Sequence, residues 1–95
     1  MIAVVAQTII KDGKKEEYLK YAEKVVAETR KEKGCIVYQC CQSNEDPLKF
    51  VMLENWESNE FLEAHMQTGH MKEYKAQIAE LTAEKPPVEL YSVTF

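Results

Sequence analysis

Several features that mark common enzyme classes are missing from this sequence. The 95 residues include only three glycines, with no glycine-rich phosphate loop, no CxxC pair and no HExxH motif, so no nucleotide, flavin or metal cofactor is expected. Twelve basic residues, with Arg30 as the sole arginine, are scattered among sixteen acidic ones and give a net charge of −4. Without an electropositive stripe, binding to nucleic acid or to an anionic membrane surface is not expected either.

Long apolar runs are also missing. No stretch approaches the roughly 18–20 apolar residues that span a bilayer, and residues 1–6 lack the basic charge that opens a secretory signal. The sequence therefore predicts a cytoplasmic protein. Its three cysteines, two of them adjacent, are a poor framework for disulfides and are expected to be reduced. In a regular strand Cys35 and Cys41 would share one face and Cys40 would lie on the other.

The sequence does contain a clear alternation of strand-like and helix-like segments. Strand-like segments are rich in β-branched residues, and helix-like segments repeat their apolar residues at spacings of three and four. Gly34 is expected to end the first helix, Ser58 to cap the second, and Pro86 to end the second after a break at Thr68–Gly69. The predicted strand, helix, strand, strand, helix and strand cover residues 2–10, 14–33, 35–43, 48–57, 59–85 and 88–95.

The order β-α-β-β-α-β with right-handed crossovers predicts a ferredoxin-like α+β fold, formed by a single domain over residues 1–95. Such a fold is an antiparallel sheet with both helices on one face. Residues 2–10 and 48–57 carry apolar side chains on both faces, whereas a half-solvated sheet alternates apolar with polar residues. We therefore expect a second copy to cover the open face, which makes the protein a homodimeric α/β barrel.

Polar residues gather at the end of the third strand and around the break in the second helix. His65 lies on the apolar stripe of that helix, so we expect it to face the sheet and to remain neutral near pH 7, which suits a general base. The alternative is a core histidine hydrogen-bonded to a neighbour such as Glu54. His70 begins the restarted helix, where the alternative to ligand binding is an exposed capping role. A spacing of five does not stack the two rings as an i, i+4 pair would, and no metal site is predicted.

Aromatic residues near this cluster are candidate walls of a ligand pocket. Trp56, the only tryptophan, would share a strand face with Glu54; it could pack in the core, or wall an aromatic ligand and donate its N–H. Tyr74 lies on the apolar ridge of the second helix, with a hydroxyl that needs a partner. The candidate catalytic residues are His65 and Trp56, and the candidate substrate-binding residues are Phe50, Met52, Glu54, Phe61, His70 and Tyr74.

Three motifs carry a resemblance to a known family. They are a helix-to-strand junction, T-R-x-E-x-G-C-x-x-Y, at residues 29–38, a strand motif, E-x-W, at 54–56, and a helix motif, H-x-x-x-x-H, at 65–70. Together they resemble the antibiotic biosynthesis monooxygenase family over nearly the whole chain. The resemblance implies a small dimeric α+β barrel with a pocket between the sheet and the helices of each subunit. His65, Trp56 and Glu54 match motif positions of that pocket, and His70 and Tyr74 would lie at its rim.

The resemblance also implies a range of activities. It favours a monooxygenase that oxidises a quinol-like or phenolic substrate with O2 and without flavin or metal. In that reaction His65 would remove a hydroxyl proton, Trp56 and Phe50 would sandwich the ring, and the Trp56 N–H or the Tyr74 O–H would stabilise the oxyanion. The alternatives are an isomerase of a small phosphorylated carbonyl compound and a non-catalytic dimeric module that binds an aromatic metabolite or haem. The haem-degrading branch fits less well, since it has an asparagine in the first strand where this chain has Gln7.

Overall fold

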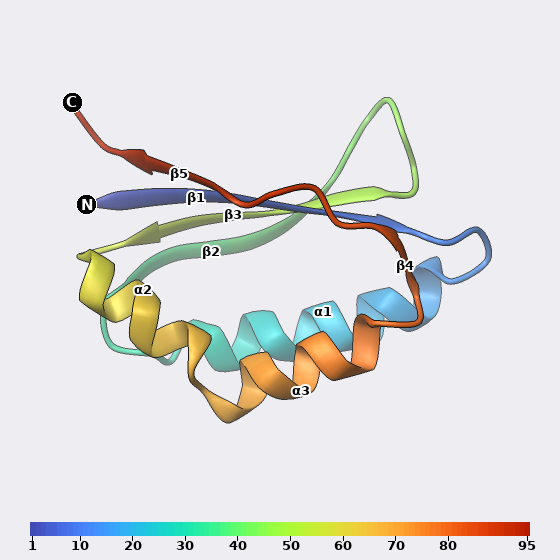
Figure 1. Ribbon diagram of the computed structural model, residues 1–95, viewed down its shortest axis with the longest axis horizontal. Helices are drawn as coiled ribbons and strands as arrows, with labels where there is room; N and C mark the ends of the chain where they lie inside the picture. Colours follow the sequence, from blue (N-terminus) through green and yellow to red (C-terminus); the bar gives the residue numbers. More distant parts are fainter.

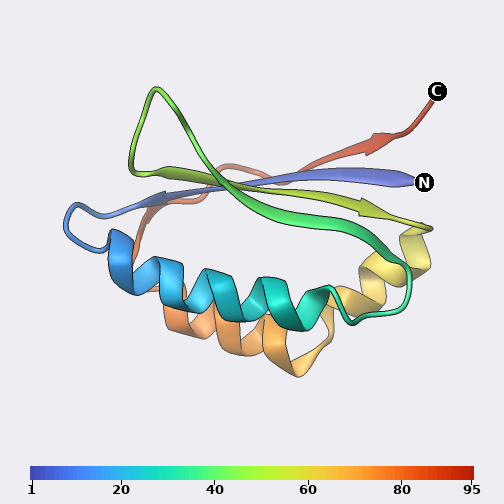
Figure 2. The ribbon, with the colours of Figure 1, turned by 180° about the vertical axis from the view of Figure 1, so that it is seen from behind.

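The computed structural model describes residues 1–95 and consists of a sheet with three helices packed on one of its faces (Figures 1 and 2). All helices lie below the sheet in Figure 1, so the prediction that the helices share one face is confirmed. The elements are β1 (Ile2–Ile10), α1 (Lys15–Thr29), β2 (Cys35–Gln42), β3 (Lys49–Trp56), α2 (Asn59–Met66), α3 (Gly69–Ile78), β4 (Thr82–Glu84) and β5 (Glu89–Ser92).

The sheet is antiparallel and is built around β1. Its strand order is β2-β3-β1-β4, and β5 pairs with β1 as well. β3 lies along almost the whole of β1, from Ile2 opposite Trp56 to Ile9 opposite Lys49. β4 and β5 follow the other edge of β1, β4 near Ile10 and β5 near Ile2. The predicted ferredoxin-like fold is therefore confirmed.

The helices are shorter than the sequence pattern predicts. α1 ends at Thr29 rather than near Gly34, and the residues between them form hydrogen-bonded turns. α3 ends at Ile78, although the predicted helix ran to Pro86. There the Thr82 hydroxyl donates to the Ile78 carbonyl, and the following residues pair with β1 as the unpredicted strand β4. Pairing with the free edge of β1 gives the backbone N–H and C=O groups of these residues, and those of β1, hydrogen-bond partners, which another helical turn would not give to β1.

β2 contains an irregularity that changes the predicted placement of the cysteines. Its register with β3 shifts between Cys35 and Val37, so one extra residue interrupts the alternation of faces. As a result Cys35 and Cys40 both pack against the core, opposite Trp56 and Met52. The prediction that Cys35 shares a face with Cys41 was wrong for this reason. All three thiols are free.

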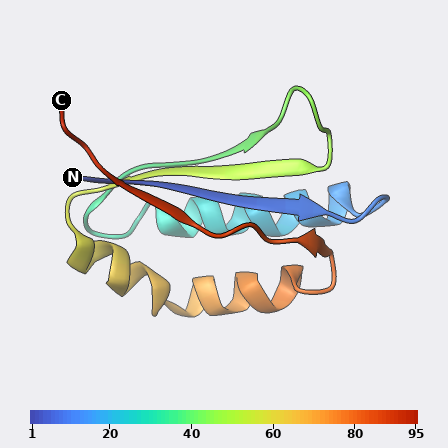
Figure 3. The same ribbon diagram turned by 45° about the horizontal axis from the view of Figure 1, so that its top comes forward.

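The core lies between the helices and the adjacent face of the sheet. Fifteen buried apolar residues form it, with Trp56 and Ile10 completely inaccessible to solvent. The other face of the sheet is covered by no helix (Figure 3) and presents apolar side chains such as Val5 and the exposed Leu53. No helix is both long and apolar enough to cross a membrane.

Candidate functional site

A cavity of about 380 Å³ lies between the sheet and the helix pair α2–α3. This volume falls within the usual range for small-molecule sites. The strands contribute its floor through side chains such as Thr8 and Met52, and the segment that contains Lys85 and Leu90 forms one wall. Most of the lining is apolar, with a few polar groups among it. The cavity therefore occupies the place, between the sheet and the helices, that the sequence predicts for a pocket.

His65 is the buried polar group at the helix side of this cavity. Its side chain is 1% exposed, and its ring packs between Tyr38 and Trp56, with ring centroids 5.4 and 4.7 Å away. Burial lowers the pKa of His65 below its ordinary value, although the neighbouring Glu32 carboxylate acts in the opposite direction. The imidazole is thus held in the neutral form that can accept a proton.

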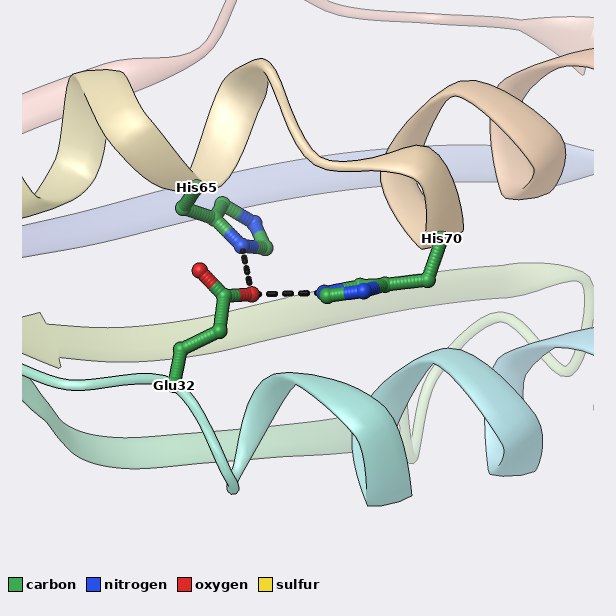
Figure 4. A group of neighbouring side chains, drawn as sticks. All are labelled: Glu32, His65 and His70. Carbon is green, nitrogen blue, oxygen red and sulfur yellow. Dashed lines mark hydrogen bonds and ion pairs between the residues drawn. The ribbon is translucent and has the colours of Figure 1, made fainter.

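Glu32 fixes the orientation of that imidazole. The His65 Nδ1 lies 2.7 Å from the Glu32 Oε2 (Figure 4). Because a carboxylate only accepts hydrogen bonds, Nδ1 must carry the proton, and the lone pair is then on Nε2. Nε2 has no hydrogen-bond partner within the protein. The pair is therefore arranged as a carboxylate-oriented base, with Glu32 able to stabilise the imidazolium that forms.

The turn after α1 places Glu32 at this point. Gly34 adopts a φ of +85°, which a residue with a side chain rarely adopts, and a Cβ there would overlap the Phe61 ring. The Gly34 carbonyl also accepts a hydrogen bond from the backbone N–H of Glu57 at 2.9 Å. These contacts bring the turn against the start of α2, so that Glu32 can reach the opposite end of that helix.

His70 also forms a hydrogen bond with the Glu32 carboxylate. The break between α2 and α3 is capped by Thr68, whose hydroxyl accepts from the Met71 N–H, and α3 then presents His70 in its first turn. The His70 Nε2 lies 2.6 Å from the Glu32 Oε2, so both rings meet one oxygen (Figure 4). One ligand atom from each of Glu32, His65 and His70 lies within 4.8 Å of the other two.

Glu54 is a second titratable group in the cavity. It is 7% exposed and accepts a hydrogen bond from the Trp56 Nε1 at 2.9 Å. Burial raises the pKa of Glu54 to about 7, against the lowering effects of the Trp56 hydrogen bond and the charge of Lys85. Glu54 therefore exchanges a proton near neutral pH, and the indole N–H that was a candidate oxyanion donor is engaged with it.

Tyrosine hydroxyls are further polar groups of the cavity. The Tyr74 hydroxyl lies 2.9 Å from that of Tyr18 on α1. The Tyr38 hydroxyl donates to the Met71 sulfur at 4.0 Å, which is a weak contact, and the neighbouring Thr29 side chain acts to lower its pKa. Burial raises the pKa of Tyr74 to about 12 and also that of Tyr38, so both stay protonated. Tyr38 is thus the freest hydroxyl donor in the cavity.

The structure divides the predicted site residues into two groups. His65, Met52, Glu54 and Tyr74 line the cavity. Trp56, Phe50, Phe61 and His70 do not line it. Trp56 lies behind His65, Phe50 packs on Tyr18 with ring centroids 5.0 Å apart, and Phe61 covers Gly34. The expected sandwich of a substrate ring between Trp56 and Phe50 is therefore not present in this arrangement.

Four further residues of the site were missed from the sequence. Lys75 and Lys85 line the cavity, and the Lys85 ammonium donates to the Thr8 hydroxyl at 3.3 Å. Tyr38 was visible as the last residue of the junction motif, but its free hydroxyl was not predictable. Glu32, in the same motif, is the partner of His65, whereas the sequence analysis considered Glu54 for that role.

This chain is similar to several known proteins. Residues 1–77 match the family described as "Antibiotic biosynthesis monooxygenase". The Escherichia coli K12 protein named "Probable quinol monooxygenase YgiN" is 34% identical over 88 residues, covering 82% of this chain and 85% of its own. A Synechocystis protein, sll1783, is 26% identical over 97% of this chain, which spans only 63% of that protein's length.

A solved structure has the same fold. The crystal structure of a conserved protein from Methanosarcina mazei Go1 superposes with a TM-score of 0.91 at 32% identity, over 95% of this chain and 89% of the other. The family match over residues 1–77 and the 34% identity to the Escherichia coli protein show which family this chain is in. This chain belongs to the antibiotic biosynthesis monooxygenase family.

Proposed function

We propose that this protein is a cofactor-independent monooxygenase that oxidises a quinol-like or phenolic aromatic compound with O2. The observation that carries the proposal is the Glu32–His65 pair, at 2.7 Å, beside an apolar cavity of about 380 Å³. Deprotonation makes such a substrate electron-rich enough to reduce O2 directly. The protein then needs to supply only a base, an apolar pocket and a donor for the oxyanion.

Each of these functions has a residue in the cavity. His65 removes the hydroxyl proton through Nε2, while Glu32 holds the ring and stabilises the imidazolium. The Tyr38 hydroxyl donates to the substrate oxyanion, since it has no strong partner of its own. One oxygen atom of O2 is inserted into the ring and the other leaves as water. The substrate supplies all the electrons and is released as a hydroxylated quinone.

The test is oxygen uptake by EDTA-treated protein with a panel of chemically reduced quinols, with products identified by mass spectrometry. We expect saturable uptake above autoxidation, reduced by roughly 10²–10⁴-fold in His65→Ala. Glu32→Gln keeps the volume of the side chain and should lower kcat by about 10-fold, as loss of an orienting partner does. Glu28→Gln is the matched control, because the Glu28 carboxylate is paired with the exposed Lys31 and not with His65 or His70. Full turnover by a folded His65→Ala variant would refute the assignment of the base.

An isomerase that acts on a small phosphorylated carbonyl compound is the second candidate. Lys75 and Lys85 at the cavity supply the positive charge that a phosphate requires. Such a reaction would use the same base and would proceed without oxygen. If the quinol panel gives no uptake, anaerobic binding followed by fluorescence of Trp56 shows which ligands bind. Conversion of a bound phosphorylated compound then distinguishes the isomerase from a module that only binds an aromatic metabolite or haem.

We also propose a homodimer, in which a second copy covers the open face of the sheet. The support is the apolar character of that face, where Val5 lies opposite the exposed Leu53 in the β1–β3 pairing. A chain of this size also buries a limited share of its surface alone.

A further inference from the structure

We propose that Glu32, His65 and His70 form a binding site for one divalent first-row transition-metal ion of the zinc type. This inference does not depend on the proposed oxygenase activity. The spacing of the two histidines in the sequence gave no reason to expect such a site. It arises because three separate segments, the turn after α1, the end of α2 and the start of α3, converge on one point (Figure 4).

The chemistry of the three side chains matches that of known metal sites. Two imidazoles and one carboxylate are the protein ligands of many zinc sites that keep a fourth position for water. Imidazole and carboxylate ligands together also suit iron, cobalt and nickel. Both rings already direct a nitrogen toward the same carboxylate oxygen, at 2.7 and 2.6 Å. The ligand atoms are therefore gathered before an ion arrives.

The geometry requires only a small adjustment to bind an ion. The three ligand atoms lie within 4.8 Å of one another. A tetrahedral ion with bonds of about 2.0–2.1 Å needs ligand atoms about 3.4 Å apart. Rotation of the His70 and Glu32 side chains can supply this change, because they are 22% and 14% exposed while His65 is buried. The same exposure gives an ion a route from solvent and leaves room for a bound water.

The ion would replace the protons that now join the three groups. In the metal-free state each ring must donate an N–H to Glu32, because a carboxylate only accepts. An ion on the same nitrogens moves each proton to the other nitrogen of its ring or to solvent. Where the proton moves to the other nitrogen of its ring, the imidazole changes tautomer and stays neutral, so the ion meets a lone pair without a change in ring charge.

The test is titration of EDTA-stripped wild-type protein with Co²⁺, followed by its visible absorption, and with Zn²⁺ by calorimetry. We expect one ion per chain, and weakening by more than roughly 100-fold in His70→Ala and in Glu32→Gln, which exceeds the usual loss when an outer-shell partner is removed. The chain has only two histidines, so no other histidine pair competes.

Two controls separate this site from other binding. Glu28→Gln removes the same charge from the end of α1 and should bind Co²⁺ as the wild type does. Alkylation of the three thiols should also leave binding unchanged, which excludes cysteine ligands. The proposal is overturned if no saturable binding of one ion per chain is found. It is equally overturned if His70→Ala and Glu32→Gln, shown to be folded by circular dichroism, bind as tightly as the wild type.

Discussion

Replacing Glu54 by glutamine should stabilise the protein at alkaline pH and should leave it unchanged at acidic pH. Glu54 lies in the middle of the sheet, between Val4 and Tyr38 on the neighbouring strands, and is 7% exposed. Its pKa rises from an ordinary 4.5 to about 7, chiefly through burial. A raised carboxyl pKa means that the folded state binds the proton more tightly than the unfolded state does. Stability is then lost as pH increases between these two values.

The magnitude follows from the gap between 4.5 and about 7. At about 1.4 kcal/mol for each pH unit, this gap corresponds to about 3 kcal/mol of unfolding free energy lost by pH 8. Glutamine has no charge to desolvate, and its carbonyl oxygen can still accept the Trp56 N–H. The Glu54→Gln variant should therefore match the wild type near pH 4.5 and exceed it by about 3 kcal/mol at pH 8.

The assay is urea unfolding of both proteins at several pH values between 4.5 and 8, followed by Trp56 fluorescence and by circular dichroism. The difference between the two proteins is the relevant quantity, because His65 titrates with the opposite sign: its lowered pKa makes the protein more stable as pH rises. Glu23→Gln, on the exposed face of α1, is the matched control. A difference between Glu54→Gln and wild type that stays constant over this pH range would refute the reasoning.

Three further predictions follow from other parts of the structure. Gly34→Ala should lower the unfolding free energy by roughly 2–4 kcal/mol, because it combines an unfavourable φ with overlap. Gly13→Ala, with a φ of +80° and no atom nearby, should cost only about 1 kcal/mol by the same urea assay. Leu53→Asp should convert a dimer of twice 11.0 kDa into a monomer in light scattering; a monomeric wild type would contradict the dimer. Zn²⁺ should inhibit oxygen uptake in the wild type far more than in His70→Ala, each relative to its metal-free rate, and equal inhibition would contradict this.

The fold was predictable because local patterns and long-range pairing agree. β1 and β3 have apolar residues on both of their faces, as expected for strands inside a sheet. The apolar residues of α1 recur on one stripe, which includes the buried Tyr18 and Val25. The end of α3 was not predictable in the same way. Its last turns compete with pairing to β1, and the periodicity of a single segment does not contain that tertiary contact.

The site was only partly predictable, for a related reason. His65 and Glu54 were found because polar residues on an apolar stripe or strand face are uncommon. The partner of His65 was not found, since Glu32 is 33 positions away and reaches it only through the turn that Gly34 makes. The aromatic residues were assigned to the cavity although several of them support it from behind. Sequence spacing indicates which face of a strand or helix a residue occupies. It does not indicate whether the side chain lines the cavity or packs behind the residues that line it.

The short connection between α1 and β2 has a consequence for how this protein tolerates change in length. Surface connections usually accept insertions and deletions at small cost. Here the connection carries Glu32 and is anchored at both ends, by the last turn of α1 and by the Gly34 contacts with α2. Adding or removing one residue would turn the Glu32 carboxylate away from His65 and release the ring to adopt its other tautomer. The number of residues in this turn is therefore a determinant of basicity inside the cavity.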